Sequence, residues 1–436
     1  MIFVLSQGCA ANFGDGEKIA RILSQKSEVS FEFPEHSVGD AASAPEAFYL
    51  NVCTVKGNAG ALKLLRRAAS AYPDVPIYIT GCAPKDFREE ATKAVPKVQF
   101  TTLADLEKDP LLGFNLGNAK QDRTREKESD QNIARHKNVL RESPYVGIVN
   151  IEEGCLDACA FCSTHLVKGR LHSFAPSAIV DQVQALVDDG CLEIQLTGQD
   201  CACYGFDIGT NLAKLTQRIL THVNGNYRIR LGMGNPRHVL GYQEALLDCF
   251  TDERLYKFIH IPVQSGSEKV LKAMNRRHTA RDYATLAHAF TERFSKFTFS
   301  TDLIVGYPGE TSEDFNETLE LLKETRPTVC NITRFVARPG TVAARLEASA
   351  DEVPDTVKHE RSAILAETFQ QIALENNREW IGDECTVVTE KPGYRSGTTI
   401  ARNAAYRPVA LQGSFPAGKT LRVRITDAEP FALLAE

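Results

Sequence analysis

Residues 154–162 read GCLDACAFC and place Cys155, Cys159 and Cys162 in a C-x3-C-x2-C pattern. They follow an apolar run, YVGIVNI (145–151), which predicts a buried strand. Zinc sites and iron–sulfur clusters commonly use four protein ligands, and no fourth cysteine follows closely. Three thiolates would leave one iron of a cluster free for an exchangeable ligand, as a catalytic metal keeps an open position. An alternative is a zinc site completed by His165.

A second set of three cysteines, Cys9, Cys53 and Cys82, is dispersed through the first part of the chain. Each comes just after a short apolar run (IFVL, FYLNV and IYIT), and these runs predict buried strands. The three thiols should therefore gather in loops at the carboxyl ends of one sheet, where open α/β sheets bind ligands. The other six cysteines are expected to be ordinary buried thiols: Cys191, Cys201, Cys203, Cys249, Cys330 and Cys385. Cys201 and Cys203 form a C-x-C pair, for which a regulatory or metal-binding role stays open.

The chain outside these cysteines predicts an α/β protein with a small all-β end. Residues 1–112 alternate strand-like and helix-like segments, which is typical of a small parallel α/β domain. Residues 113–144 are polar and charge-dense, and predict a linker or an exposed helical arm. From 145 to 375 strand and helix signals alternate again, which favours a complete or partial β/α barrel. Within it Thr311 and Asp314 predict a capping box at a helix start.

The last segment, 378–436, has short strand candidates separated by glycines, which suggests a small β-barrel. Its basic side chains lie mostly at predicted strand ends and form a candidate RNA-binding set: Lys391, Arg395, Arg402, Arg407, Lys419, Arg422 and Arg424. Arg422 and Arg424 alternate within one predicted strand, so they should share a face. A structural barrel with solvated charges would explain the same residues.

Composition is that of a globular protein, with 436 residues, 43% hydrophobic, 24% charged and a net charge of −6. No apolar run is long enough for a membrane span, and the first residues lack the basic region of a secretory signal. A cytoplasmic protein without a membrane partner is the expectation. There, cysteines serve as metal ligands or buried thiols more often than as disulfides. Mild acidity argues against broad coating of nucleic acid but leaves room for a local basic face.

These motifs resemble the radical S-adenosylmethionine (SAM) methylthiotransferases. The resemblance covers nearly the whole chain, through QGCAANFGDGE, NVCTVKGNA, TGCAPK, GCLDACAFC, EIQLTGQDCACYG, IRLGMGNP, HIPVQSGSEKVLKAMNRR, DLIVGYPGETSEDF and FVARPGTVAAR. The C-terminal segment resembles the TRAM RNA-binding module of these enzymes. The resemblance implies two [4Fe–4S] clusters, one on each cysteine set. The cluster on Cys155, Cys159 and Cys162 would bind SAM and cleave it to a radical. The other would carry the sulfur that is methylated and then inserted.

The resemblance also suggests SAM contacts beside the cysteines. Phe161 would lie near the adenine, and Thr197, Gln199 and Asp200 near the methionine part. Further candidates lie at or beyond strand ends: Arg230, Asn235, Gln264, Ser265 and Arg276. Each of these could instead have a structural role, and His260 is expected to be a satisfied core histidine.

Substrates in the family are isopentenylated adenosine in tRNA, threonylcarbamoyladenosine in tRNA, or an aspartate of a ribosomal protein. LTGQDCACYG, RLGMGNP and NITRFVARPGT resemble the archaeal and eukaryotic threonylcarbamoyladenosine branch. The resemblance therefore implies the anticodon arm of tRNA as partner, an electron donor that the sequence does not identify, and action as a monomer. The two other substrates remain alternatives. A non-catalytic iron–sulfur RNA-binding protein is an alternative of another class, although electron carriers need closed ligation by four cysteines.

Overall fold

The computed structural model describes residues 1–34, 45–53, 58–108, 140–348 and 352–436. Its first part is a five-stranded parallel sheet in the order β2-β1-β3-β4-β5. The strands are β1 (Ile2–Ser6), β2 (Val29–Ser30), β3 (Ala47–Cys53), β4 (Ile77–Cys82) and β5 (Gln99–Phe100). The helices are α1 (Ala10–Leu23), α2 (Ala59–Ala71), α3 (Lys85–Ala94) and α4 (Leu103–Lys108).

Both faces of this sheet are buried, which explains why its strands read as continuous apolar runs. Phe48 and Leu50 of β3 belong to the core on one face, together with Leu65 of α2. Val4 of β1 belongs to the core on the other face, together with Ile19 of α1. The predicted parallel α/β class is confirmed for this part.

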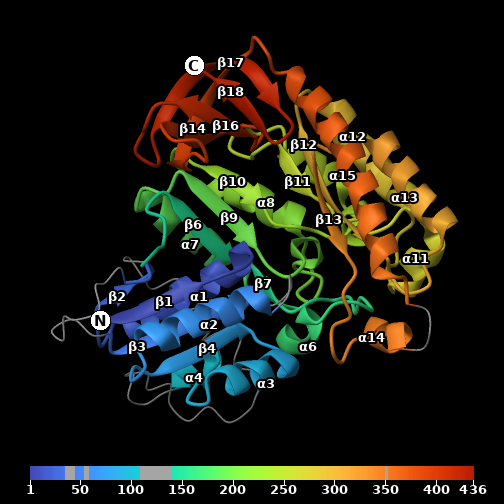
Figure 1. The fold of residues 1–436 in the computed structure, drawn as a ribbon. Coiled ribbons are helices and arrows are strands. Elements are labelled where there is room, and N and C mark those ends of the chain that lie inside the picture. The colour runs from blue at the N-terminus through green and yellow to red at the C-terminus, as the bar shows by residue number, and fades with distance from the viewer. Residues whose placement is uncertain (35–44, 54–57, 109–139, 349–351) are drawn as a thin grey trace.

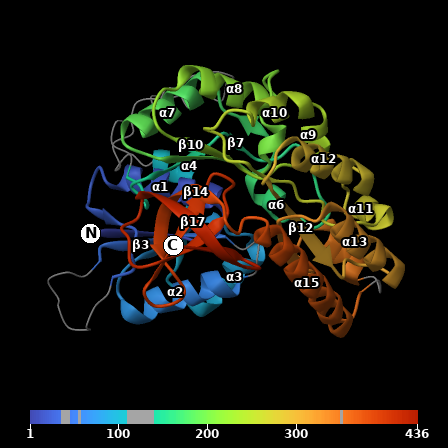
Figure 2. The same ribbon diagram turned by 90° about the horizontal axis from the view of Figure 1, so that it is seen from above.

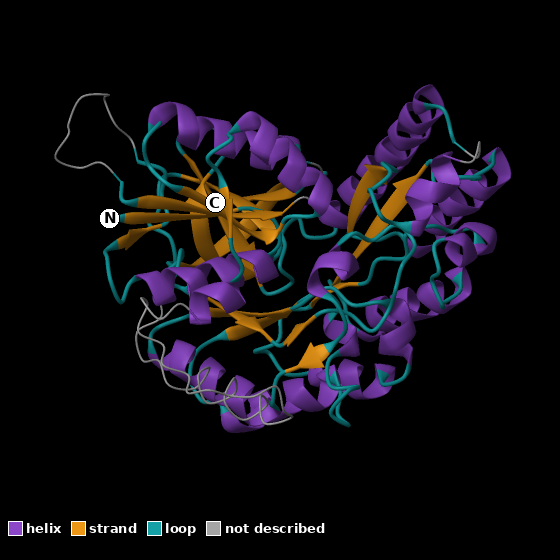
Figure 3. Ribbon diagram, turned by 90° about the horizontal axis from the view of Figure 1, so that it is seen from below, coloured by secondary structure: helices purple, strands orange, loops and turns teal. Residues whose placement is uncertain are grey.

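The middle part forms two three-stranded parallel sheets, in the orders β10-β9-β6 and β11-β12-β13. Their strands are β6 (Val146–Asn150), β9 (Glu193–Thr197), β10 (Arg228–Leu231), β11 (Phe258–His260), β12 (Thr298–Val305) and β13 (Val329–Arg334). Together they make a partial barrel with strands inside and helices outside (Figures 2 and 3). A short antiparallel pair, β7 (Glu152–Glu153) and β8 (His172–Ser173), follows β6.

The outer helices run in an arc around the two sheets (Figure 2). They are α7 (Pro176–Asp188), α8 (Leu212–His222), α9 (Pro236–Leu240), α10 (Gln243–Cys249), α11 (Glu268–Ala273), α12 (Ala280–Arg293), α13 (Ser312–Thr325) and α15 (Asp355–Arg378). Two short helices, α6 (Thr164–Lys168) and α14 (Val342–Leu346), lie below the two sheets in Figure 1. The 3-10 turn η3 (Cys201–Cys203) follows β9. The predicted capping box is confirmed, since Thr311 accepts from the backbone of Asp314 and the Asp314 side chain accepts in return.

The C-terminal part is a closed barrel in the order β14-β15-β16-β18-β17. The strands are β14 (Glu384–Pro392), β15 (Thr398–Asn403), β16 (Pro408–Gln412), β17 (Thr420–Glu429) and β18 (Ala432–Ala435). The predicted small barrel is confirmed, but it contains β18, which the sequence did not predict. Arg422 and Arg424 are both exposed and share a face of β17, as expected from alternation.

This barrel packs against the amino ends of the partial-barrel strands (Figure 1). Tyr406 donates a hydrogen bond to Glu193, the first residue of β9, at 3.0 Å. Tyr145, which precedes β6, donates to the backbone oxygen of Glu390 at 3.1 Å. A cavity of about 420 Å³ lies where the three parts meet, lined among others by Gly8, Tyr145 and Tyr406. None of the described helices is long and apolar enough to cross a bilayer.

Most of the predicted linker, 113–139, lies outside the described residues. Its end contacts α1, where the backbone NH of Glu142 donates to the Glu17 carboxylate at 3.2 Å. Burial raises the pKa of Glu17 from its ordinary 4.5 to about 8, although the hydrogen bond from the Glu142 backbone and the positive charge of Arg141 oppose that rise. Stability from this group is therefore fully present below about pH 4.5 and is lost as the pH rises through 8.

We expect Glu17→Gln to stabilise the protein at pH 8.5 relative to wild type. The gain should be a few kcal/mol, because each unit of pKa corresponds to about 1.36 kcal/mol. Near pH 4.5 the difference should vanish. Urea unfolding of both proteins between pH 4.5 and 8.5 measures it. A constant difference across this range would show that folding does not raise the pKa of Glu17.

Candidate active site

Cys155, Cys159 and Cys162 lie in the loop that follows β6 and β7, at the carboxyl end of the first barrel strand, as predicted. Backbone bonds fix the shape of this loop: the Cys155 NH donates to Gly169 O at 3.2 Å, and the Cys162 NH donates to Cys159 O at 3.1 Å. All three thiols are half-buried. The loop therefore presents them together beside the barrel mouth.

Two neighbouring side chains act on these sulfur atoms. Arg276 donates to Cys159 Sγ at 3.5 Å. Burial raises the pKa of Cys159 to about 11, and the Arg276 guanidinium opposes that rise. A hydrogen bond from Cys203 lowers the pKa of Cys155. Arg276, predicted as a SAM contact, thus contacts a cysteine of the C-x3-C-x2-C set.

A buried polar network, which the sequence did not reveal, holds the centre of the loop. The Asp157 carboxylate accepts hydrogen bonds from Asn235 Nδ2 at 2.8 Å and from Arg237 at 2.5 Å. It also lies 2.9 Å from His238 Nε2. Burial opposes ionisation of Asp157, but His238 and Arg237 outweigh it and keep the pKa of Asp157 below its usual range. The network ties the cysteine loop to α9. The predicted residue Asn235 belongs to it.

The residues after β9 reach the same place. Gln199 Oε1 accepts from the backbone NH of Gly154, next to Cys155, at 2.7 Å. Asp200 Oδ1 accepts from the backbone NH of Asn235 at 2.9 Å, while its Oδ2 has no hydrogen-bond partner. Thr197 ends β9 and is buried. Gln199 and Asp200 therefore border the cysteine loop directly.

Three other predicted SAM contacts, Phe161, Gln264 and Ser265, are packed or buried within the protein. Phe161 packs against the small core that contains Tyr307 and Phe335. Gln264 is buried with a φ of 79°, and Ser265 is hydrogen-bonded to Thr318 at 3.2 Å. Phe161 and Ser265 thus have packing or hydrogen-bond partners within the protein, and their contacts with SAM stay predictions.

Arg230 and His260 are also engaged elsewhere. The Arg230 guanidinium lies over the rings of Phe258 and Tyr406, toward the C-terminal barrel. His260 lies 2.9 Å from Asp302, which agrees with the expectation of a satisfied histidine.

The dispersed set also comes together. Cys53 and Cys82 end β3 and β4 and are direct partners in the parallel register. Cys9 is the residue before α1, and its thiol interacts electrostatically with Cys53. The pKa of Cys82 is raised, mainly by a hydrogen bond with Cys53 and secondly by burial. The expected gathering of three thiols at one sheet edge is therefore what the structure shows.

Gly8 makes room for this set. Its φ is +117°, and a Cβ there would overlap Cys53 Cβ and lie 2.8 Å from Cys53 Sγ. If each cysteine set holds one [4Fe–4S] cluster, we expect Gly8→Ala to lose about half of the bound iron after reconstitution, because the substitution disturbs the N-terminal set alone. Iron and sulfide analysis measures this. Gly60→Ala is the control, since a Cβ at Gly60 has only Gln7 within 4 Å, at 3.9 Å. Full iron content in Gly8→Ala would contradict this placement.

The N-terminal set faces the middle part through a buried ion pair. Lys168 Nζ, six residues after Cys162, lies 2.8 Å from Asp15 of α1 and 3.6 Å from Glu153. The same ammonium interacts electrostatically with Cys82. Asp15 also accepts from Asn150, the last residue of β6, at 2.8 Å. Lys168 and Asn150 were not singled out from the sequence, because only the folded chain brings them to Asp15.

Sulfur spacing tests whether the two sets suit clusters or single ions. Two sulfurs on one tetrahedral zinc lie about 3.8 Å apart, given Zn–S bonds of about 2.3 Å. Among the described residues, neither set has all of its sulfurs within 4.8 Å of one another, and His165 joins no such group. The donor sets therefore suit a cluster of several irons better than one zinc ion.

The predicted RNA-binding residues divide by exposure. Arg407 is buried and donates to Asn377 at 2.6 Å, and Arg402 is ion-paired with Glu390 at 2.8 Å. The Arg407 guanidinium therefore lies inside the protein, whereas Arg402 is partly exposed and lines the cavity between the three parts. The remaining members of the set are exposed: Lys391, Arg395, Lys419, Arg422 and Arg424.

Comparison with known proteins agrees with this geometry. The Radical SAM superfamily matches residues 149–322. A protein of Archaeoglobus fulgidus named probable threonylcarbamoyladenosine tRNA methylthiotransferase is 36% identical over 98% of this chain and 96% of its own length. The human threonylcarbamoyladenosine tRNA methylthiotransferase is 30% identical over 98% of this chain and 72% of its own length.

Among solved structures, the radical SAM methyltransferase TsrM from Kitasatospora setae has a similar fold, with a TM-score of 0.54 and 13% identity. The likeness covers 79% of this chain and 76% of that one. At this identity it concerns the fold alone. The full-length relatives and the radical SAM match together show that this chain belongs to the threonylcarbamoyladenosine tRNA methylthiotransferase family of the radical SAM superfamily.

Proposed function

We propose that this protein converts N6-threonylcarbamoyladenosine, on the 3′ side of the anticodon in tRNA, to its 2-methylthio derivative. The observation that carries the proposal is full-length similarity to relatives with that name, combined with two three-cysteine sets at the carboxyl ends of neighbouring sheets. An aromatic C–H bond has no acidic proton, so ionisable side chains cannot activate it. The cofactors must supply that chemistry, and the protein must hold and orient them.

Membership of the superfamily implies SAM and one [4Fe–4S] cluster, and the described residues fit both. We propose that Cys155, Cys159 and Cys162 hold this cluster and that Cys9, Cys53 and Cys82 hold a second one. Bound SAM and the clusters would supply the radical and the sulfur. Arg276 would place a positive charge on a cluster sulfur, which favours the thiolate form.

Other residues would position SAM and exclude water. Gln199 and Asp200 border the cysteine loop, and the free Asp200 Oδ2 can accept from a bound ammonium group. Lys168 and Asp15 hold the N-terminal sheet against the barrel mouth, next to Cys82. This contact would keep the sulfur-carrying set close to the target carbon, a requirement for efficient transfer.

The C-terminal barrel would bind the RNA backbone. A base in the single-stranded anticodon loop can be unstacked into a pocket, while basic side chains hold the phosphates. Arg422 and Arg424 are exposed side by side on β17, and Arg422 pairs with Glu384 at 2.8 Å. The junction cavity is lined by Lys391 and by Gly8, the neighbour of Cys9, and so connects the C-terminal barrel with the N-terminal set.

Charge reversal tests this surface. The double substitution Arg422→Glu/Arg424→Glu should weaken tRNA binding. It should also make the slope of log binding constant against log salt concentration shallower by about 2, because each lost phosphate contact removes about 1. Binding measured at several salt concentrations gives the slope. Lys323→Glu on α13 is the control, because Lys323 is exposed on a different part of the molecule. Unchanged affinity in the double variant would place the RNA elsewhere.

The electron donor, action as a monomer and a cytoplasmic location remain predictions. Pull-down under reducing, anaerobic conditions, sedimentation of the free protein and cell fractionation would check them in turn.

Nucleoside mass spectrometry of tRNA from cells that lack the gene tests the proposed function. We expect the 2-methylthio derivative to disappear and threonylcarbamoyladenosine to accumulate. Loss of methylthio-isopentenyladenosine, or of a modified ribosomal-protein aspartate, would instead support the corresponding alternative. No change in any of these would favour a non-catalytic iron–sulfur protein.

A further inference from the structure

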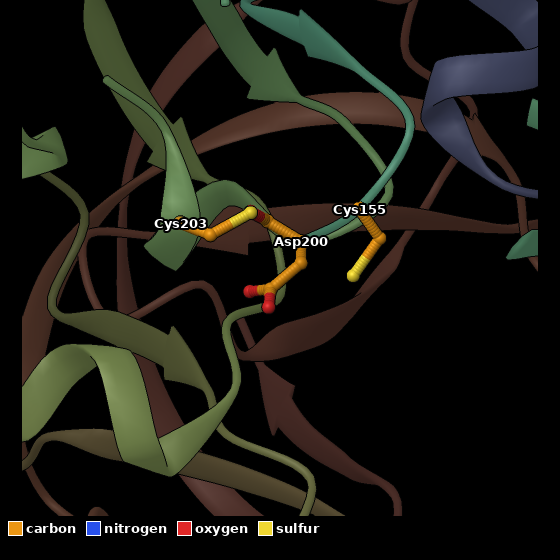
Figure 4. Close-up of side chains that lie close together, drawn as sticks. All are labelled: Cys155, Asp200 and Cys203. Carbon is orange, nitrogen blue, oxygen red and sulfur yellow. The ribbon is translucent and has the colours of Figure 1, made fainter. Parts of the chain in front are cut away.

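Cys203, expected to be an ordinary buried thiol, lies beside the cysteine loop. Its Sγ, Cys155 Sγ and a carboxylate oxygen of Asp200 all lie within 4.8 Å of one another (Figure 4). Cys203 is fully buried, and Asp200 is 2% exposed. This group of ligand atoms combines one cysteine of the cluster set with two residues outside it.

Local structure explains how Cys203 reaches this position. Asp200 caps the 3-10 turn η3, and the Cys203 thiol donates to the backbone oxygen of Asp200 at 3.1 Å. Cys201, two residues earlier, is also buried but turns toward Leu196 O, 3.8 Å away. The thiols of Cys201 and Cys203 therefore lie on different sides of the turn η3.

The Asp200 carboxylate supplies an independent sign of a ligand. Its Oδ2 is buried and has no hydrogen-bond partner among the residues that the structure describes. Such an atom is costly to bury and is rare in folded proteins unless water, an ion or a ligand satisfies it. Burial raises the pKa of Asp200, and the ring of His238, 3.7 Å from Oδ2, only partly compensates.

The donor set is suited to one transition-metal ion. Two sulfurs and one carboxylate oxygen match zinc or ferrous iron, with ligand bonds of about 2.0–2.3 Å. The spacing within 4.8 Å is close to what a single ion requires, whereas Cys155, Cys159 and Cys162 are spread more widely. We propose that the protein without its cluster binds one divalent zinc or iron ion on Cys155, Cys203 and Asp200, with a fourth position open to water.

This site would affect cluster assembly. Binding releases the protons of the two thiols and makes a bond to Cys155, which then cannot ligate the cluster. A zinc ion on Cys155 and Cys203 should therefore delay formation of the [4Fe–4S] cluster, whereas ferrous iron could pass into it. The inference concerns metal binding by the cluster-free chain, so it can fail while the proposed reaction stands.

Cobalt is the probe for this site, because Co²⁺ occupies zinc sites and gives strong absorbance when thiolates ligate it. Metal-free, full-length Cys53→Ser/Cys82→Ser protein is titrated with Co²⁺ under anaerobic conditions, so that the N-terminal set does not compete. We expect a single equivalent to bind with thiolate absorbance. Adding Cys203→Ala should weaken binding by at least about tenfold.

Two further variants separate the possible locations. Cys201→Ala is the matched control and should bind as the parent does, because its thiol faces away from the site. Cys162→Ala should also bind as the parent. If Cys162→Ala abolishes binding and Cys203→Ala does not, the ion lies on the C-x3-C-x2-C set and the proposal is wrong.

Cluster formation gives a second readout. Preloading the same full-length Cys53→Ser/Cys82→Ser background with zinc should slow iron–sulfur reconstitution severalfold, and Cys203→Ser should remove this delay. Cys203→Ser nearly preserves side-chain volume, so circular dichroism can verify that its fold is retained. An equal zinc delay with and without Cys203→Ser would contradict the proposal.

Discussion

Cys53→Ala should abolish methylthiolation while leaving SAM cleavage close to the wild-type rate. Cys53 ends β3 opposite Cys82, in the N-terminal set and outside the loop that holds Cys155. The variant should retain the radical SAM cluster and lose the other, so its iron content should fall from about eight to about four atoms per protein. Iron analysis, 5′-deoxyadenosine formation and nucleoside mass spectrometry on one preparation measure all three effects.

Cys249→Ala is the matched control for this experiment. Cys249 is a buried thiol that lies on α10, and its Sγ contacts Ala245 O at 3.2 Å. The control should keep both the iron and the product. If Cys53→Ala loses SAM cleavage as well, the two sets are not independent. If it still forms the methylthio product, sulfur does not come from the N-terminal set.

Arg361→Ala should lower the free energy of unfolding by about 3–5 kcal/mol, because it leaves the buried Glu310 carboxylate without its cation. Arg361 of α15 contacts Glu310 Oε1 at 2.5 Å, and both side chains are more than nine-tenths buried. The helix α15 joins the barrel to the C-terminal part, so the ion pair anchors that connection. Urea unfolding measures the change.

Lys323→Ala provides the comparison on the neighbouring helix α13. Lys323 pairs with Glu320 at 2.8 Å, but these side chains are 49% and 70% exposed. Water screens such a pair, and its loss should cost less than about 1 kcal/mol. Equal destabilisation by the two substitutions would show that burial does not set the strength of the Arg361 ion pair.

The elements of the fold that could be predicted from the sequence are those with a local signal. IFVL, FYLNV and IYIT form β1, β3 and β4 because parallel strands between two helical layers are apolar throughout. The capping box at Thr311 is also local. The short strand β18 was missed, because its ALLA sequence becomes a strand only by pairing with β16 and β17.

The cysteine sets could be predicted because strand ends in a parallel sheet meet at one edge. The network around Asp157 could not, since Arg237 and His238 are about eighty residues away and carry no pattern of their own. Burial of Arg407 was equally hidden, because its partner Asn377 comes from α15, 30 residues earlier in the chain. Cys203 is buried as expected, but its position beside Cys155 could not be predicted, since only the turn after Asp200 brings the two thiols together.

The most direct test uses the reconstituted wild-type protein with both clusters, SAM, a reductant and tRNA that carries threonylcarbamoyladenosine. Mass spectrometry of the digested tRNA should show the 2-methylthio nucleoside, formed together with 5′-deoxyadenosine. If SAM is cleaved while this tRNA stays unmodified and tRNA with isopentenyladenosine gains the methylthio group, the assigned substrate is wrong. If neither tRNA changes although both clusters are present, the proposed methylthiotransferase activity itself is contradicted.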